Sequence, residues 1–333
     1  MTNKVKLGCS YFGNRILRYV KKDMEFLAKN SFDYVVHTFS ENDLAFYHKT
    51  MEEIVKATHN AGLQVHIDPW GVGKIFGGEA FSEIISQKPR LREILSDNEP
   101  AGIACLNHPE FRDFMKGWIK AAVETGADVI FWDEPHFYLP HWMGGRPNTW
   151  GCRCNFCKDK YHQRYGEELP QIETEQVIEF KQNSIKDFLS EMISYVKSFG
   201  IKNALCSLPA DSKSIKNWES LVYIDGLDIF GTDPYWYIGN KNAGEYVGFY
   251  SREVVKLTKK ASKKSEIWIQ GFKIPKGKEN EIAIAVESAV QSGVEYLAVW
   301  GFEACAAISY IRADNPKKAW KILLNAFKKA KNI

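Results

Sequence analysis

Eight short runs of β-branched and aromatic residues recur along this chain, and each is followed by a longer stretch of helical periodicity. Such runs predict buried strands, and apolar residues three or four positions apart predict helices that pack on one face. The predicted strands span residues 5–12, 33–39, 63–70, 128–134, 201–208, 227–233, 266–272 and 294–300. The predicted helices span residues 16–30, 48–61, 108–125, 174–199, 212–222, 242–263, 278–292 and 315–331. Eight strand–helix units predict an α/β chain that folds as a (β/α)8 TIM barrel.

The rival arrangement is a doubly wound sheet, which would carry a glycine-rich phosphate loop after its first strand. The segment Tyr11-Phe12-Gly13-Asn14 lacks the G-x-G-x-x-G pattern of such a loop. No low-complexity linker divides the chain, so we expect residues 1–333 to form one domain. Two connections are long, residues 71–107 after the third strand and residues 135–173 after the fourth. Loops after barrel strands lie at the C-terminal face, where barrel enzymes carry their chemistry.

Charge and apolar patterning narrow the class of protein. The chain has 44 Lys and Arg against 41 Asp and Glu, and its formal charge of +3 is too small to indicate a nucleic acid or an acidic membrane surface as a partner. No apolar run approaches the length of about 18 residues that a membrane span needs, and the first residues, MTNKVKLGCSYFG, lack the apolar core of a signal peptide. We therefore expect a cytoplasmic protein that binds neither nucleic acid nor membrane. Homo-oligomer formation stays open.

Carboxylates and aromatic rings gather at the ends of the predicted strands. The third, fourth and sixth strands end in Asp68-Pro69, Glu134-Pro135 and Asp233-Pro234, each beside aromatic residues. One Asp-Pro is ordinary turn chemistry, but turn formation gives no reason for three such ends on separate strands. Sugar C–H faces stack on aromatic rings, and carboxylates perform acid/base work at a glycosidic bond. This combination predicts a carbohydrate site and needs no organic cofactor.

The candidate site residues lie at or just after a predicted strand, or in one of the two long loops. The expected substrate-binding residues are Tyr11, His37, Asp68, Trp70, His136, Trp142, Trp150, Tyr235, Trp236, Gln270 and Trp300. Asp133 and Glu134 are adjacent at the end of the fourth strand, and two neighbouring carboxyls in a partly dry site resist double ionisation, which raises one pKa. Glu134 has the longer side chain and is the predicted general acid. The alternative is an ordinary surface glutamate on a loop.

Three of the seven cysteines are crowded into one C-x-C-x-x-C segment, at Cys152, Cys154 and Cys157. An odd number of cysteines disfavours a full disulfide framework. Zinc takes four ligands in a closed structural site, and Cys105 is the only cysteine in another long loop. The pattern therefore favours a structural zinc site, with free thiols and an iron–sulfur cluster as the alternatives.

The segment Cys105–Arg112, with the sequence CLNHPEFR, resembles the C-P-N-x-P-x-Y-R segment of the family 42 glycoside hydrolases, which are bacterial β-galactosidases. In that family the segment precedes a strand-four Asn-Glu that carries the acid/base, then a C-x-C-x-x-C, an aromatic residue and a Tyr-Gly. The matching residues here are, in order, Asp133-Glu134, Cys152, Cys154, Cys157, Tyr161 and Tyr165-Gly166. The resemblance is specific over residues 100–166. It implies a β-galactosidase-like barrel whose four cysteines bind a structural zinc.

The chain departs from that family at two positions. The family carries a nucleophilic Glu at the end of strand seven, where this chain has Gln270, and an amide cannot form the glycosyl ester. The Asn that precedes the acid/base is replaced by Asp133. The chain is also far shorter than the members of that family, so we expect it to lack their additional domains. The resemblance therefore does not transfer β-galactosidase activity to this chain.

Three functional hypotheses follow. The first is a glycoside hydrolase in which Glu134 works with a second carboxylate, supplied by Asp233, Glu303 or Asp133. The second is a substrate-assisted N-acetylhexosaminidase, in which the 2-acetamido group of the sugar replaces an enzymic nucleophile and Asp133-Glu134 does the rest. The third is a non-catalytic carbohydrate-binding barrel that has lost its nucleophile. A metal-dependent hydrolase is disfavoured, because the histidines in or beside the predicted strands form no H-x-H pair.

Overall fold

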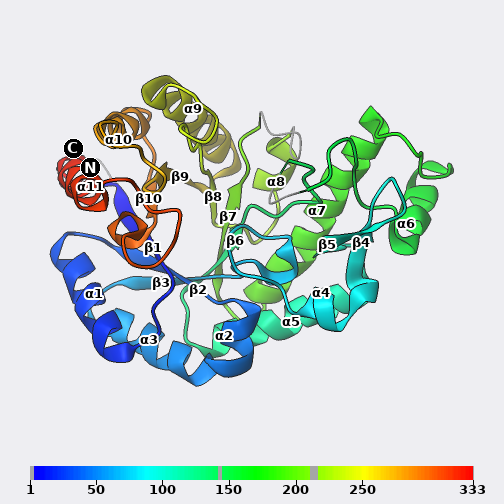
Figure 1. The fold of residues 1–333 in the computed structure, drawn as a ribbon, viewed down its shortest axis with the longest axis horizontal. Helices are drawn as coiled ribbons and strands as arrows, with labels where there is room; N and C mark the ends of the chain where they lie inside the picture. Colours follow the sequence, from blue (N-terminus) through cyan, green and yellow to red (C-terminus); the bar gives the residue numbers. More distant parts are fainter. Residues whose placement is uncertain (1–3, 142–144, 211–216, 333) are drawn as a thin grey trace.

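A closed barrel of eight parallel strands forms the centre of the computed structural model, which describes residues 4–141, 145–210 and 217–332 (Figure 1). The barrel strands are β1 (Lys6–Tyr11), β2 (Tyr34–Thr38), β3 (Gln64–Asp68), β6 (Val129–Asp133), β7 (Lys202–Ser207), β8 (Ile229–Thr232), β9 (Lys264–Gln270) and β10 (Tyr296–Trp300). Around the barrel the order is β1-β10-β9-β8-β7-β6-β3-β2. Each of the eight predicted strands forms, and the predicted (β/α)8 TIM barrel is confirmed.

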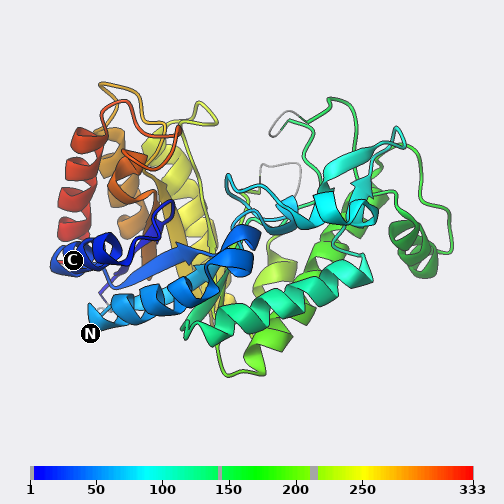
Figure 2. The same cartoon turned by 60° about the horizontal axis from the view of Figure 1, so that its bottom comes forward.

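Helices alternate with the strands and cover the outside of the barrel (Figure 2). The longer helices are α1 (Leu17–Lys29), α3 (His48–Asn60), α5 (Pro109–Glu124), α7 (Glu175–Lys197), α9 (Ala243–Ala261), α10 (Glu281–Gln291) and α11 (Pro316–Ala330). The shorter ones are α2 (Glu41–Phe46), α4 (Ile84–Gln87), α6 (Asn155–Tyr165) and α8 (Glu219–Val222), with 3-10 turns η1 (Val72–Lys74), η2 (Pro89–Leu91) and η3 (Phe302–Cys305). Gly62, Gly126, Gly200 and Gly293 follow four of the helices at φ between 76° and 89°. Glycine ends helices there because the left-handed region costs it no steric penalty.

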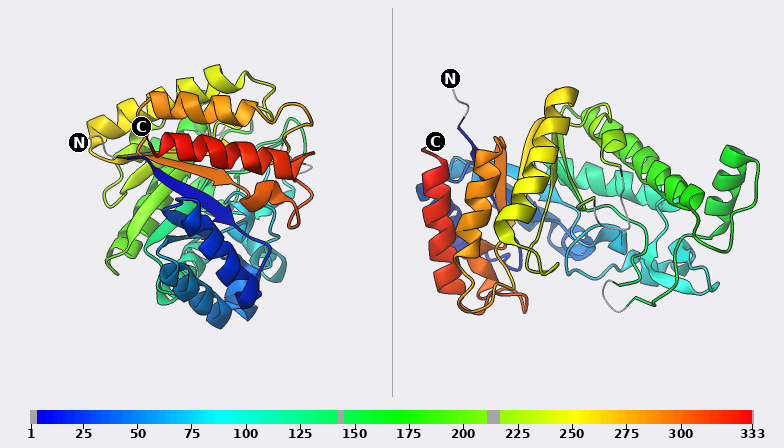
Figure 3. Two further views of the ribbon diagram at one scale, coloured as in Figure 1. Left: turned by 90° about the vertical axis from the view of Figure 1, so that its left-hand side faces the viewer. Right: turned by 90° about the horizontal axis from the view of Figure 1, so that it is seen from above.

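The two long loops form a lobe beside the barrel, where the cyan hairpin and the green helix α6 project to one side in Figures 2 and 3. The hairpin pairs β4 (Arg92–Ile94) with β5 (Pro100–Ala104) in antiparallel orientation. A single bridge between Leu95 and Gly151 ties the loop after β3 to the loop after β6. The sequence predicted the two loops by their length but not the hairpin within them.

Two hydrophobic cores divide the side chains of each strand. One core fills the barrel with interior residues such as Val36, Phe131 and Trp268, and the other lies between the barrel wall and the helices. Because side chains alternate along a strand, Asp133 and Gln270 point into the barrel at its C-terminal end, two positions after Phe131 and Trp268. The same alternation points Trp132, between Phe131 and Asp133, toward the helices.

The N- and C-terminal ends of the described chain lie close together at one side of the barrel (Figure 3). Lys331 links them, because its Nζ donates to Asp33 Oδ2 at 2.5 Å and to the backbone oxygen of Val5 at 3.1 Å. Across the described ranges, no helix combines the length and the apolar character that crossing a bilayer requires.

Candidate active site and metal site

A cavity of about 640 Å³ opens at the C-terminal ends of the barrel strands. Its carboxyl groups come from three places in the chain: Asp133 and Glu134 at the end of β6, Asp233 just after β8, and Glu79 in the loop after β3. The remaining described residues that line it are Gly78, His141, Leu208, Pro209, Tyr235, Ile238, Gly239, Lys241, Tyr246, Phe272, Lys273, Trp300, Tyr310 and Ile311. Acids and aromatic rings thus share one cavity, in a size range typical of small-molecule sites.

Backbone hydrogen bonds fix Asp133 and Glu134 at the end of β6. The Glu134 N–H donates to the carbonyl oxygen of Cys206 on β7 at 2.9 Å, and the Glu134 carbonyl accepts from His136 Nδ1 at 2.6 Å. Glu134 has a φ of 45°, a left-handed conformation that is uncommon for a residue with a side chain. Strained backbone of this kind clusters at functional sites, since the surrounding contacts must hold it in place.

Gly77, in the loop after β3, packs directly on the two carboxyl groups. A Cβ atom at this position would lie 2.3 Å from Asp133 Oδ2 and 3.0 Å from Glu134 Oε2, so a side chain there would collide with both acids. The Gly77 N–H also donates to the Asp133 carbonyl oxygen at 3.0 Å. The long loop is therefore seated on the pair, and only glycine permits this close approach.

Burial and neighbouring carboxyls raise the pKa values of the acids in the cavity. The pKa of Glu134 lies well above its ordinary value because the side chain is buried and because Asp233 adds a like charge and a hydrogen bond. Burial likewise raises the pKa of Asp233, to about 7, against a hydrogen bond from Glu134 that lowers it. Burial, then the charges of Glu134 and Glu79, raise the pKa of Asp133. The cluster therefore retains protons at a pH where free carboxyls have lost them.

Asp68 lies beneath this cluster and is fully buried. Neither of its carboxyl oxygens has a hydrogen-bond partner among the described residues. Burial and the charge of Asp133 raise its pKa well above the ordinary value, which favours a neutral carboxyl. Asp68 contributes to the electrostatics of the cavity without being part of its described lining.

Gln270 and Glu303 differ sharply in their surroundings. Gln270 is fully buried, its Oε1 accepts from the Tyr237 N–H at 3.1 Å, and its Nε2 donates to the Phe272 carbonyl oxygen at 3.0 Å. Its amide thus ties together the backbone after β8 and the backbone after β9. Glu303 is exposed, and burial of part of its side chain and the charge of Asp23 raise its pKa. Glu303 does not belong to the described lining of the cavity.

Two of the aromatic residues predicted to bind the substrate, Tyr235 and Trp300, line the cavity. Trp300 stacks on Phe12 with ring centres 5.6 Å apart, and Phe12 contacts Trp70 at 5.4 Å. Trp70 therefore supports the aromatic wall from behind. Trp142 lies outside the described residues.

The other predicted substrate-binding residues have partners away from the cavity. Tyr11 donates to Asp23, His37 contacts Thr58, Trp150 donates to the Gln171 carbonyl, and Trp236 donates to Glu281, at distances between 2.5 and 3.1 Å. The described lining of the large cavity contains none of these four residues. His136 lines a smaller neighbouring cavity of about 240 Å³, and burial lowers its pKa to about 4.

Sequence reasoning missed several residues that line the cavity, namely Glu79, Lys241, Tyr246, Phe272, Lys273 and Tyr310. Most lie in loops beyond the strand ends, where no periodicity indicates the direction of a side chain. Phe272 falls at the end of a predicted strand, and its aromatic ring beside Gln270 was the one available indication.

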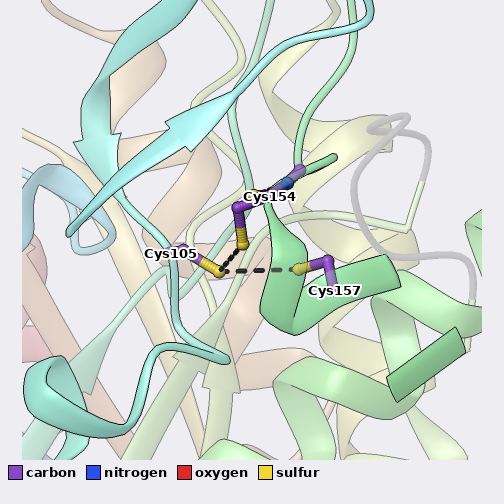
Figure 4. Close-up of side chains that lie close together, drawn as sticks. Cys105, Cys154 and Cys157 are labelled. Carbon is purple, nitrogen blue, oxygen red and sulfur yellow. Dashed lines mark hydrogen bonds between the residues drawn. The ribbon is translucent and has the colours of Figure 1, made fainter. Parts of the chain in front are cut away.

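The four predicted metal-binding cysteines come together in the lobe, and Figure 4 shows three of them, Cys105, Cys154 and Cys157. Their sulfur atoms all lie within 4.8 Å of one another, and Cys105 Sγ is 3.5 Å from Sγ of both Cys154 and Cys157. Four thiolates bound at about 2.3 Å to one zinc ion would lie about 3.8 Å apart, so these spacings fit a tetrahedral ion. Hydrogen bonds from Cys105, Cys152 and Cys157 lower the pKa of Cys154. This four-cysteine group could hold a metal ion.

Groups around the sulfurs complete this site. Asn107 Nδ2 donates to Cys157 Sγ at 3.3 Å, and the Cys154 N–H donates to Cys152 Sγ at 3.3 Å. Lys160 Nζ in turn donates to Asn107 Oδ1 at 3.0 Å. Hydrogen bonds of this kind orient metal ligands and stabilise thiolate charge. The arrangement joins the end of the hairpin to the start of α6.

No protein-family model and no curated protein matches this chain. Solved structures match its fold. A beta-galactosidase from Bacillus circulans sp. alkalophilus gives a TM-score of 0.72 at 9% identity, covering 99% of this chain and 56% of its own. The catalytic domain of a beta-amylase from Paenibacillus polymyxa gives 0.63 at 10% identity, covering 90% and 92%. A beta-N-acetylhexosaminidase from Bacteroides fragilis gives 0.58 at 11% identity, covering 99% and 65%. At such identities the likeness shows the barrel fold, and one fold hosts many activities.

Proposed function

We propose that this protein is a glycoside hydrolase in which Glu134 is the general acid. The observation that supports the proposal most is the contact between Glu134 and Asp233 in the wall of the large cavity, together with the burial of both. A carboxyl group that keeps its proton near neutral pH can donate it to the oxygen of a departing sugar or aglycone. Likeness in fold to enzymes named for saccharides agrees with this proposal.

The neighbouring acids would divide the remaining work. Asp233, hydrogen-bonded to Glu134, would hold the proton in place and stabilise the Glu134 carboxylate after donation. Asp133, whose pKa is raised as well, would act toward the substrate as a hydrogen-bonding carboxyl group. Tyr235 and Trp300 would supply the apolar surfaces on which the C–H face of a sugar stacks. Glu303, outside the described lining, is the weakest of the sequence candidates for a second carboxylate.

Activity can be tested with a panel of aryl glycosides, including gluco-, galacto-, manno- and N-acetylglucosaminides. We expect the wild-type protein to cleave at least one, and Glu134→Gln to lower kcat by about 100-fold to 10,000-fold, because the general acid is lost. Glu167 is an exposed glutamate in the long loop that follows Glu134. Glu167→Gln is therefore the matched control and should keep full activity. Unchanged turnover in Glu134→Gln would end the proposed role of this residue.

A substrate-assisted N-acetylhexosaminidase is the second candidate. The observation that favours it is the state of Gln270, an amide whose two polar groups are both committed to backbone, so that strand β9 offers no nucleophile at its end. In this substrate-assisted mechanism Asp133 would orient the 2-acetamido group of the sugar and Glu134 would donate the proton. Cleavage restricted to N-acetylglucosaminides would support it. Saccharide binding without turnover of any glycoside would point instead to the non-catalytic barrel.

We also propose that the four-cysteine group holds a structural zinc ion. Four sulfur ligands leave zinc no open position, so the ion would connect the two long loops and take no part in catalysis. Metal analysis of purified protein should find about one zinc ion per chain. Less than about half a zinc ion per chain, or iron in place of zinc, would count against a structural zinc site. Cytoplasmic location and homo-oligomer formation stay predictions from the sequence.

A further inference from the structure

Glu79, in the loop after β3, also lines the large cavity, and the proposed roles of Glu134, Asp233 and Asp133 do not involve it. Sequence reasoning did not single it out, since it lies eleven positions past the strand. Its Oε2 atom is buried, and hydrogen bonds from Trp70 and from its own backbone N–H lower the pKa of the carboxyl group. A carboxylate has about four acceptor sites on its two oxygens, so beside these bonds it can still accept a hydrogen bond from a water molecule or a substrate.

The loop that carries Glu79 is tied down on both sides of this residue. Lys74 Nζ donates to the carbonyl oxygens of Gly78 at 3.1 Å and Ala80 at 3.0 Å, the two residues that flank Glu79. The Gly71 N–H donates to the Gly77 carbonyl oxygen at 2.8 Å, which closes the loop on itself. A side chain on such a fixed backbone meets the requirement that catalytic groups be held in a defined position.

Glu79 and Glu134 enter the large cavity from different segments of the chain. Glu134 follows β6 and contacts Asp233 after β8. The charge of Glu79 acts on Asp133, at the end of β6, and also on Cys305, after β10, and Lys273, after β9, acts on Glu79. In the ring of eight strands, β10 lies directly across from β6. A sugar bound between Glu79 and Glu134 in this cavity would present one carboxyl group to each face of its anomeric carbon.

The two glutamates also have contrasting electrostatic surroundings. Burial raises the pKa of Glu79, but hydrogen bonds from its own backbone N–H and from Trp70, and then the positive charges of Lys74 and Lys273, act against that rise. Glu134 has the Asp233 carboxyl beside it, which raises its pKa further. Of the two, Glu79 thus gives up its proton more readily. Pairs of acids with pKa values pushed apart in this way divide into a general acid and a general base.

We propose that Glu79 is the catalytic base that acts across the cavity from Glu134, an inference that rests on the proposed glycosidase function. The Glu79 carboxylate takes a proton from a water molecule, and the water oxygen forms a bond to the anomeric carbon. The bond from that carbon to the leaving oxygen breaks, and the leaving oxygen takes the proton of Glu134. Water is thereby added across the glycosidic bond with inversion at the anomeric carbon, and both glutamates regain their starting states by exchange with solvent. This route needs no carboxylate at Gln270.

The test compares Glu79→Gln, Glu134→Gln and the matched control Glu83→Gln, an exposed glutamate in the same loop. The substrates are the 4-nitrophenyl and 2,4-dinitrophenyl forms of the glycoside that the wild type cleaves fastest. We expect Glu79→Gln to lose about 100-fold or more in kcat on both substrates with little change in KM, because water needs the base whatever the leaving group. The acidic limb of the pH–rate profile, which reports the protonation of the base, should be absent in Glu79→Gln. Proton NMR of the wild-type reaction should show that the first product has inverted configuration at the anomeric carbon.

Each result separates this inference from the proposed function. If Glu134→Gln loses activity while Glu79→Gln behaves like Glu83→Gln, or if the product retains configuration, the role of Glu79 is overturned and Glu134 stands. If the wild type cleaves no glycoside in the panel, both proposals fall together. Glu79→Asp guards against misfolding as an explanation, since it should keep the acidic limb with a smaller loss in kcat. If Glu79→Asp has full activity and the acidic limb of the pH–rate profile persists in both Glu79→Asp and Glu79→Gln, the proposal is contradicted.

Discussion

The cysteine group in the lobe and the acid cluster in the barrel mouth are both sets of acidic groups that the fold takes out of water. The four sulfurs lie within 4.8 Å of one another and face inward on a common centre. The acids Asp133, Glu134 and Asp233 instead form one wall of a cavity of about 640 Å³. The first arrangement is closed and the second is open on one side.

This difference shows two ways of reducing the cost of burying negative charge. Thiolates that converge on a point can share one cation, which satisfies all four at once. Carboxyls spread along a wall reduce their charge by retaining protons, as the raised pKa values of Glu134 and Asp233 indicate. A cation makes a site rigid, whereas retained protons can be given away. The closed group therefore suits structure, and the open one suits proton transfer.

Loss of one sulfur ligand should give the largest effect. Cys105→Ser is expected to lower the free energy of unfolding by on the order of 4 kcal/mol, because the remaining ligands bind the ion poorly and the lobe loses its connection. Thermal unfolding with and without a chelator measures this. The chelator should destabilise the wild type and leave the variant unaffected. If the wild-type protein contains no metal and the chelator does not change its thermal unfolding, the four-cysteine group is not a metal site.

Gly77→Ala tests whether the acid wall depends on close contact with the loop after β3. The added methyl group would lie 2.3 Å from Asp133 Oδ2, so the carboxyl or the loop must shift. We expect kcat to fall by about 10-fold to 100-fold, since small misplacements of catalytic groups have large effects. Gly102→Ala is the control, because a Cβ atom there meets no other atom within 4 Å. Equal activities of the two variants would show that the contact is not needed.

The pH dependence of stability should distinguish retained protons from shared metal. Burial raises the pKa of Asp233 from 3.8 to about 7, so the folded protein holds a proton there that the unfolded chain releases. The stability that this proton gives is present below about pH 4 and is lost as the pH rises through about 7. Urea unfolding of Asp233→Asn should therefore show a shallower decline between about pH 5 and about pH 7 than the wild type. An unchanged slope would mean that Asp233 is ionised in the folded protein.

Removal of an aromatic side chain from the cavity should have the smallest effect. Tyr235→Ala is expected to weaken binding of the best substrate by about 3-fold to 10-fold, because one stacking surface contributes about 1 kcal/mol. Inhibition by the free sugar measures the affinity. Tyr223→Ala, an exposed tyrosine outside the described lining, is the control. A loss no greater than that of the control would place the sugar elsewhere in the cavity.

Much of the fold followed from the sequence, because strands buried on both faces and amphipathic helices leave clear periodicities. The four cysteines were also predicted, since metal ligation requires a particular residue type at close spacing. The hairpin β4–β5 was missed because its strands are short and include Pro100 and Gly102, residues that are uncommon inside strands.

The site was harder to predict, because closeness to a strand end does not give the direction of a side chain. Tyr11 ends β1 and His37 lies one position before the end of β2, but both side chains point away from the barrel interior, toward the helices. Strict alternation from interior residues such as Val36 would have indicated this. Glu79 could not be predicted in this way, since it reaches the cavity through a glycine-rich loop without periodicity. Its position depends on contacts made by Lys74 and Gly77, which only the folded structure shows.

The most direct test of the central claim, that Glu134 donates a proton to the leaving group, is the dependence of Glu134→Gln on leaving-group chemistry. The rate of this variant relative to the wild type should be measured on the 4-nitrophenyl and 2,4-dinitrophenyl forms of the best glycoside. A dinitrophenolate leaves with little need for a proton, so we expect the loss of rate in Glu134→Gln to be at least about 10-fold smaller on that substrate. Equal losses on the two substrates would show that Glu134 is not the general acid.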